Sequence, residues 1–204
     1  MNEQIEPVVE NLVRQLLTVV GEDPDRPGLK KTPMRAAAAF STVLEGYGRS
    51  FKEEITSFDN DQQYSELVYS GGIDFFSTCE HHMLPFFGKA YIAYIPDKKI
   101  IGLSKLTRVT DIYSRRLQQQ ERLTTQIAND LNELLSPKGV IALIEGKHLC
   151  NMARGVRQVN STMITIARHG LFDDEKRYNQ FMQFVALSKR QTDVPNGSTT
   201  NAGN

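Results

Sequence analysis

Residues 67–95 read LVYSGGIDFFSTCEHHMLPFFGKAYIAYI. Two segments of this stretch, Leu67–Phe76 and Lys89–Ile95, are rich in β-branched and aromatic residues, which favour strands. The run Cys79-Glu80-His81-His82 lies between them. The sequence therefore predicts two consecutive strands whose connection carries a cluster of thiol and imidazole side chains.

The first sixty residues have helical patterns instead. Apolar side chains recur at helical spacing over residues 4–20, and a glycine follows as a stop signal. Turn-forming residues fill positions 21–28. We expect Thr32 to cap a second helix, with Pro33 at its first position, that ends near residues 46–48.

The second half of the chain predicts two helices, two strands and a final helix. With the first strand pair, the order is strand, strand, helix, helix, strand, strand, which suggests an α+β domain whose antiparallel sheet is covered by helices on one face. Such a sheet has open edges, so we expect pairing between subunits in a homo-oligomer. The expected elements are a helix from a Ser104 cap to about Leu117, a helix over Glu121–Leu135, strands over Val140–Glu145 and Gln158–Ala167, and a helix capped by Asp173 or Asp174 that runs through Leu187.

Composition sets further bounds. Basic and acidic residues number 24 each, and the formal net charge of +0 favours neither nucleic acid nor a membrane surface as a partner. The chain lacks a run of eighteen apolar residues and starts with polar sequence, so we expect neither a transmembrane helix nor a secretory signal. Two cysteines, placed as metal ligands, fit the reducing cytoplasm. We expect a helical region over residues 1–60, the α+β domain over 61–190, and a disordered tail over 191–204.

Both cysteines and three of the four histidines lie in two short segments, 79–82 and 148–150. Thiolate and imidazole are preferred zinc ligands, and Cys-x-x-His is a usual ligand spacing. Three ligands, Cys79, His82 and Cys150, would leave a fourth position for water, which is typical of a catalytic Zn²⁺ site. The alternatives are two inert free thiols or a disulfide between the cysteines.

Two geometric conditions follow from this hypothesis. His148 and Cys150 share one face if their segment is a strand, because residues two apart in an extended chain point the same way. Cys79 and His82 converge only if their segment turns. His81 and His148 would lie beside the metal without binding it, and imidazole, which titrates near neutral pH, suits proton transfer.

Six motifs of this chain together resemble those of the GTP cyclohydrolase I family, with a match over about residues 5–188. They are GEDPDR (21–26), KTPMRAA (31–37), CEHH (79–82), IGLSKL (101–106), QQQERLT (118–124) and HLCNMARG (148–155). The resemblance implies a tunnelling fold and a toroidal homodecamer of two pentamers with a zinc ion at each intersubunit active site. It also implies conversion of GTP and water into 7,8-dihydroneopterin triphosphate and formate, the first step of pterin and tetrahydrofolate biosynthesis.

The resemblance assigns roles to individual side chains. His148 matches the family's acid/base, and His81 its second active-site histidine; for both, the alternative is a group that only orients the zinc ligands. Glu121 matches the residue that accepts the two N–H donors on one edge of guanine, with Gln120 beside it. The alternative for Glu121 is a helix-start glutamate favoured by the helix dipole.

Positively charged positions match the family's triphosphate contacts. The start of the helix at Ser104 offers a hydroxyl, free N–H groups and cations, which suit a phosphate, although a capped surface helix is the commoner meaning of this pattern. The resemblance favours the phosphate role. The matching residues are Ser104, Lys105, Arg108, Arg154 and, reaching in from the N-terminal helices of a subunit, Arg35.

The chain also departs from the family pattern. Ala38 occupies a position where some relatives carry a lysine as an extra triphosphate contact, and Ile166-Ala167-Arg168-His169 replaces a run of small polar residues. His169 is either a surface histidine or a local phosphate contact. Two other functions compete: another purine or pterin enzyme of the tunnelling fold, such as the nitrile reductase of deazapurine metabolism, and a zinc-stabilised oligomer that only binds nucleotides.

Overall fold

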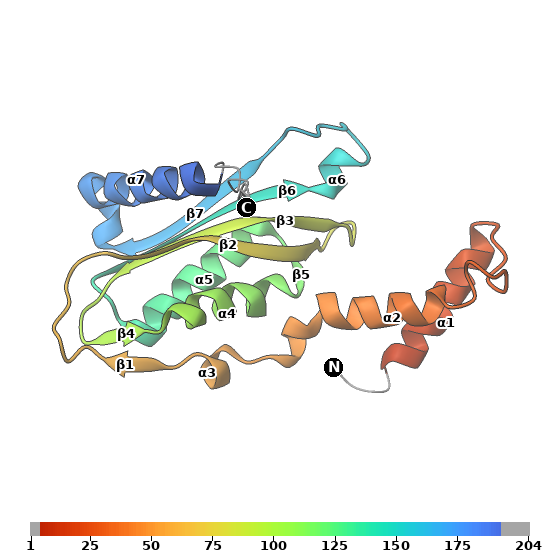
Figure 1. Cartoon of the computed structure of the whole chain (residues 1–204), viewed down its shortest axis with the longest axis horizontal. Coiled ribbons are helices and arrows are strands. Elements are labelled where there is room, and N and C mark those ends of the chain that lie inside the picture. The colour runs from red at the N-terminus through yellow and green to blue at the C-terminus, as the bar shows by residue number, and fades with distance from the viewer. Residues whose placement is uncertain (1–4, 193–204) are drawn as a thin grey trace, which may run out of the picture.

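The computed structural model describes residues 5–192, and it has the mixed α+β architecture that the sequence predicts (Figure 1). One sheet of five strands forms its centre, in the order β5-β2-β3-β6-β7. Neighbouring strands are antiparallel except β2 and β5, which run parallel. The strands are β2 (Val68–Cys79), β3 (Pro85–Ile95), β5 (Leu117–Gln118), β6 (Gly139–His148) and β7 (Met163–Gly170).

Strand register brings the two cysteine- and histidine-containing segments together. Thr78 near the end of β2 pairs with Pro85 at the start of β3, and Phe86 pairs with His148 at the end of β6. The last residues of β2 and β6 therefore lie at the same end of the sheet, on either side of β3. Segments that are separated by about seventy residues in sequence meet there.

Two helices cover one face of the sheet, α4 (Leu103–Ser114) and α5 (Gln120–Leu135) (Figure 1). The apolar stripe of α5 at i, i+4 and i+8 faces the strands, as helical periodicity predicts. Its residues Leu123, Ile127 and Leu131 are completely buried. They belong to the larger hydrophobic core, which also holds side chains of β2, β3 and β6.

The opposite face is covered by α7 (Glu175–Thr192), so the expectation that helices lie on one face only was wrong (Figure 1). Phe181 and Val185 of α7 pack in a second core against Tyr91 of β3 and Leu143 of β6. A strand buried on both faces carries apolar side chains at consecutive positions, and residues 90–95 and 140–144 have that pattern.

The N-terminal elements form an arm that extends from the sheet (Figure 1). Helix α1 keeps several apolar side chains exposed, namely Val8, Leu12, Leu16, Val19 and the following Val20. Helices α1 and α2 form the arm. The chain continues from α2 through η1, α3 and β1 to the five-stranded sheet, and β1 pairs with β4 in a separate two-stranded sheet. These elements are α1 (Ile5–Val19), α2 (Thr32–Val43), the 3₁₀-helix η1 (Glu45–Gly48), α3 (Phe51–Glu54), β1 (Ser57–Asp59) and β4 (Lys99–Ile101).

Two predicted helix caps were wrong. Thr32 is the first residue of α2, and Lys31 occupies the cap position without a side-chain hydrogen bond. Ser104 lies inside the first turn of α4, where Gly102 is the cap residue and again no side chain caps the helix. Pro33 does lie in the first turn of α2, where its missing N–H costs nothing.

Several predicted boundaries shift in the C-terminal half. Strand β7 begins at Met163 and not at Gln158, and α4 ends at Ser114. After the 3₁₀-helix η2 (Leu171–Asp173), Asp174 accepts a hydrogen bond from the Arg177 backbone N–H, so it acts as the cap of α7. This helix extends through Thr192, and the rest of the predicted tail lies outside the described residues.

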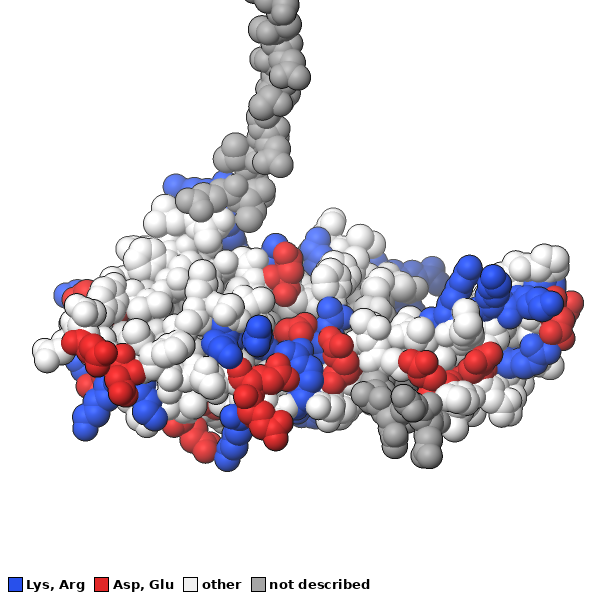
Figure 2. Space-filling view, turned by 60° about the horizontal axis from the view of Figure 1, so that its bottom comes forward, with Lys and Arg blue, Asp and Glu red and all other residues white. Residues whose placement is uncertain are grey.

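Acidic and basic side chains are interspersed over the face shown in Figure 2. This distribution accords with the zero formal net charge of the chain. Between residues 5 and 192, no helix combines the length and the apolarity that crossing a membrane requires.

Candidate metal centre and active site

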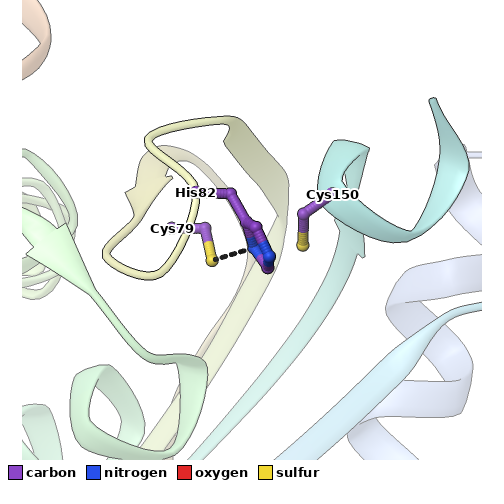
Figure 3. A group of neighbouring side chains, drawn as sticks. All are labelled: Cys79, His82 and Cys150. Carbon is purple, nitrogen blue, oxygen red and sulfur yellow. Dashed lines mark hydrogen bonds between the residues drawn. The ribbon is translucent and has the colours of Figure 1, made fainter. Parts of the chain in front are cut away.

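The metal-ligand hypothesis has a geometric counterpart in the structure. The ligand atoms of Cys79, His82 and Cys150 all lie within 4.8 Å of one another (Figure 3). The Cys79 sulfur is 3.9 Å from Nδ1 of His82. These three side chains come from the end of β2, the turn that follows it and the segment after β6.

The turn between β2 and β3 brings Cys79 and His82 together, as the hypothesis required. Backbone N–H groups of His82 and Met83 both donate to the carbonyl oxygen of Cys79, at 3.4 and 2.8 Å. Met83 has a φ of 53°, in the left-handed region. This tight reversal places a side chain three residues after Cys79 back over its sulfur.

The condition that His148 and Cys150 share one face of a strand does not hold. Strand β6 ends at His148, and Cys150 lies in the single-turn helix α6 (Leu149–Met152) (Figure 3). Both cysteines are free thiols, so the disulfide alternative was wrong. Burial raises the pKa of the Cys150 thiol, and the adjacent Cys79 acts in the same direction.

The donor set fits a zinc ion. Two ligands of one tetrahedral zinc lie roughly 3.5–3.8 Å apart, given Zn–S and Zn–N bonds of about 2.3 and 2.0 Å. The distance from Cys79 to His82 is close to that value, and the whole group needs to contract only slightly. Two sulfurs and one imidazole are ligands typical of zinc and atypical of magnesium or calcium.

His148 lies next to this group and is held on two sides. Its ring stacks on the ring of Phe86, with centroids 4.6 Å apart and planes 4° from parallel. Its Nε2 is 2.9 Å from Oε1 of Gln120. Burial lowers the pKa of His148, while the charge of Glu121 acts in the opposite direction. Burial thus favours the neutral imidazole, which has one nitrogen able to accept a proton.

His81 is more exposed and sits in a polar network. Gln119 donates through its Nε2 to Oε1 of Glu80 at 2.7 Å, and the same nitrogen is 3.1 Å from Nε2 of His81. Arg122 binds both carboxylate oxygens of Glu80 at 2.5 and 2.8 Å. This hydrogen-bonded pairing with Arg122 lowers the pKa of Glu80. Arg122 thus fixes Glu80, and Glu80 fixes the amide that contacts His81.

One pocket of about 390 Å³ is lined by Cys79, His82 and Cys150, which we call the metal group, and by other residues predicted to act in the site. Seven of the twelve predicted site residues line it, so the predicted metal ligands, the two predicted active-site histidines and the segment predicted to read the base lie together. Three further residues complete its wall. The predicted residues are Cys79, His81, His82, Gln120, Glu121, His148 and Cys150, and the additional ones are Gln118, Gln119 and Met163.

The start of α5 supplies two side chains of opposite exposure. Glu121 is exposed, and its carboxylate is free to meet a ligand in the pocket. Gln120 is only 1% exposed, and its amide is bonded within the protein. The two residues also differ in what they contact, since the Glu121 charge acts on His148 while Gln120 bonds that ring directly.

The five predicted phosphate-binding residues do not line this pocket. Ser104, Lys105 and Arg108 lie on the first turns of α4, where Lys105 donates to the backbone oxygen of Glu54 at 2.6 Å. Arg154 is exposed just after α6, near enough to Cys150 to influence its pKa. Arg35 is exposed on α2 of the N-terminal arm, with Ala38 three residues further on.

Some functional neighbours were not predicted. Phe86 belongs to a run of strand residues, and only the register of β3 with β6 shows that it supports His148. The pair Glu80 and Arg122 is separated by 42 positions, so no local pattern indicates it. His169 bonds Oδ1 of Asn129 on α5 at 2.7 Å, away from the pocket residues.

Comparisons with known proteins agree with this geometry. The family model for GTP cyclohydrolase I matches residues 9–186. A protein of Deinococcus radiodurans named GTP cyclohydrolase 1 is 49% identical over 178 residues, which are 87% of this chain and 82% of that protein. Proteins with the same name from Bacteroides fragilis and Chlorobium chlorochromatii are 46% identical over 90% of this chain and 51% identical over 80% of it, covering 96% and 74% of their own lengths.

Among solved structures, the apo form of an archaeosine synthase QueF-Like protein overlaps 51% of this chain and 93% of its own, with a TM-score of 0.42 and 16% identity. That overlap is too weak to support an argument. The family model and the curated relatives extend over nearly all the described residues, including every element that lines the pocket. The chain belongs to the GTP cyclohydrolase I family.

Proposed function

We propose that this protein is a zinc-dependent hydrolase that converts GTP and water into 7,8-dihydroneopterin triphosphate and formate, the entry step of pterin and tetrahydrofolate synthesis. The observation that carries the proposal is the pocket in which the Cys79, His82 and Cys150 group adjoins His148 and Glu121. The membership of the chain in the family supports the same activity.

The reaction requires a nucleophile and a proton donor at the guanine ring. Water must add to C8 of the base, and both bonds from C8 to the ring nitrogens must be hydrolysed, with protonation of each leaving nitrogen, before the carbon departs as formate. The second water consumed is returned when the freed amine condenses with the ribose carbons to close the new ring. A zinc ion held by the two cysteines and His82 supplies Lewis acidity that makes water nucleophilic near neutral pH. His148, which stacks on Phe86 and lines the same pocket, is the residue we assign to carry the proton.

The base is recognised by Glu121 in this proposal. A carboxylate at the pocket wall accepts both the ring N–H and the amino N–H on one edge of guanine. Adenine offers neither of those donors in the same arrangement. His81 contributes a second imidazole to the same pocket, with its orientation fixed through Gln119 and Glu80.

The triphosphate requires cations, and the described residues that line this pocket include no lysine or arginine, so assembly must bring cations to it. We assign that role to Ser104, Lys105, Arg108 and Arg154, with Arg35 contributed by a neighbouring subunit. We propose that the chain has the tunnelling fold and that it assembles into a homodecamer of two pentamers. Two features support assembly into a homo-oligomer. Strand β7 is an edge of the sheet with exposed Ile164, and α1 exposes an apolar face.

In this arrangement the N-terminal arm, residues 1–60, is a region separate from the catalytic domain over residues 61–190. The arm would place Arg35 at a site on another subunit, because it extends away from the sheet of its own chain (Figure 1). The proposal therefore requires the assembled protein for activity.

A labelled substrate tests the function directly. Protein loaded with zinc is incubated with GTP that carries ¹³C at C8, and formate is followed by ¹³C NMR while the oxidised pterin is followed by fluorescence. We expect labelled formate and pterin in equal amounts, and neither product from the Cys150→Ser variant. Release of phosphate or GDP without formate, from verified zinc-loaded protein, would show that the pocket performs another reaction.

A further inference from the structure

The amide of Gln120 is fully engaged inside the protein. The side chain lies at the start of α5 and is 1% exposed. Its Nε2 is 3.0 Å from the backbone oxygens of Ile144 and Met163 and 3.1 Å from Oγ1 of Thr165. Its Oε1 is 2.9 Å from Nε2 of His148. One side chain thus ties α5 to the two adjacent strands β6 and β7.

The surroundings permit one orientation of this amide. The backbone oxygens of Ile144 and Met163 can only accept hydrogen bonds, so the NH₂ group must face them. Exchanging the two ends would place the amide oxygen against both carbonyl oxygens at the same separation. The oxygen of Gln120 therefore faces His148. A carbonyl oxygen cannot donate, so Nε2 of His148 must carry the hydrogen of this bond.

Neighbouring hydroxyl groups agree with that orientation. Thr124 donates to the backbone oxygen of Gln120 at 2.7 Å. The hydroxyl of Thr165, 2.6 Å from that of Thr124, then donates to it. The remaining lone pairs of Thr165 are free to accept from Nε2 of Gln120, as the amide orientation requires. The two hydrogens of the amide serve these three acceptors, so one of the hydrogens is shared, and no contact in the network pairs two acceptors.

We propose that Gln120 is a positioning residue for His148: its carbonyl oxygen holds the imidazole in the Nε2–H tautomer and fixes its rotation. The stack on Phe86 sets the plane of the ring, and the bond to Gln120 sets its rotation within that plane. Nδ1 is then the ring nitrogen that exchanges a proton with the substrate. This inference rests on the proposed function for the proton-transfer role alone, since the tautomer follows from the contacts.

Gly146 provides an independent way to perturb the same amide. A Cβ atom at this position would lie 2.4 Å from Oε1 of Gln120, whereas the next nearest atom, Cδ of the same side chain, is 3.3 Å away. Glycine at this point of β6 therefore leaves the space that the amide oxygen occupies. Gly146→Ala would displace that oxygen without removing any group from the network.

The experiment reads the tautomer directly. Zinc-loaded protein is labelled with ¹³C and ¹⁵N in its four histidines, and magic-angle-spinning NMR measures the ¹⁵N shift of each ring nitrogen and the ¹³C shifts of Cγ and Cδ2. A His148→Ala variant identifies the resonances of His148. We expect the Nε2–H pattern in the wild type and a mixture of tautomers in Gln120→Leu. Turnover of GTP in that variant should fall about 10- to 100-fold with little change in KM.

A matched variant controls for the loss of a buried glutamine. Gln118 is 2% exposed and bonds the backbone oxygen of Tyr113 and the side chain of Gln126, without a contact to His148. We expect Gln118→Leu to keep the wild-type resonances of His148. A loss of the Nε2–H pattern in this control as well would assign the effect to general packing and overturn the proposal.

The remaining outcomes also decide the proposal. An Nδ1–H pattern in the wild type overturns it, whatever the variants do. Gln120→Leu that keeps both the Nε2–H pattern and full turnover overturns it too. If that variant does not assemble, Gly146→Ala replaces it, with a shifted His148 resonance and reduced turnover as support and unchanged values as refutation. Wild-type protein with the Nε2–H pattern but without formate release would refute the proposed function and leave the tautomer assignment intact.

Discussion

The substitution Phe86→Leu tests whether the stack on Phe86 positions the His148 ring in addition to stabilising the fold. Phe86 is completely buried and makes two ring contacts, an edge contact with Phe75 at 5.8 Å and the stack with His148 at 4.6 Å. Each aromatic pair contributes about 0.5–1.5 kcal/mol beyond buried area, so leucine, which keeps most of the apolar contact, should cost about 1–3 kcal/mol. For a chain of this length the Tm should fall by about 2–12 °C.

Activity should respond more strongly than stability. Without the flat support beneath it, the ring of His148 can tilt away from its substrate, and displacements of about 1 Å can reduce turnover about 100-fold. The matched control is Phe75→Leu, which loses the contact with Phe86 but leaves the stack on His148 in place. Thermal unfolding at one fixed protein concentration and kcat for formate release are measured for both variants. Equal losses of kcat in the two would refute a positioning role for the stack.

Three further predictions test other parts of the account. Cys150→Ser should lose the bound metal and the turnover together, and metal analysis by mass spectrometry after dialysis checks this; full activity in a metal-free sample would contradict it. Glu121→Gln should keep the metal but lose most discrimination of GTP from ATP in competition binding, since an amide presents one donor where the base needs an acceptor. Hydrogen bonding to Arg49 lowers the pKa of Glu54. This carboxylate therefore contributes stability above its unfolded pKa of about 4.3, which is lost on further acidification. Glu54→Gln should flatten the fall of Tm as the pH is lowered from about 5 to about 3, and an unchanged fall over that range would argue against the pairing.

Local sequence patterns predicted the extent of individual helices and which of their side chains are buried. The apolar spacing of α5 predicts both its extent and its buried stripe, because helix periodicity alone selects Leu123, Ile127 and Leu131. The same reasoning fails for α7. Its pattern shows that one side is buried, but whether Phe181 packs on one face of the sheet or the other depends on the path of the chain after β7.

The residues of the candidate metal centre were predicted from sequence, whereas the contacts around them were not. Ligand chemistry pointed to Cys79, His82 and Cys150, which the structure brings together. Sequence left open which element carries Cys150, and β6 ends two residues earlier, where the chain turns into α6. Gln120 illustrates what sequence cannot provide. Its partners are backbone oxygens of residues 144 and 163, which carry no signal in side-chain identity.

The predicted caps show a related limit. Serine and threonine are frequent helix caps, yet Thr32 and Ser104 both lie one or two residues inside their helices. At α4 the chain enters from β4 through Gly102, which takes the cap position in an extended conformation. The residue at which a helix begins therefore depends on the path of the backbone before it, which is set by tertiary structure and not by the local sequence.

The proposed activity depends most on one metal ion bound by two cysteines and one histidine. Zinc K-edge X-ray absorption on the purified protein measures that coordination directly. We predict about one zinc per chain with two sulfur neighbours at about 2.3 Å and two lighter atoms at about 2.0–2.1 Å. Cys150→Ser protein should bind less zinc, and the zinc that remains should have one sulfur neighbour. A wild-type spectrum with no sulfur neighbours, or purified protein that retains no zinc after loading, would contradict the proposed zinc site.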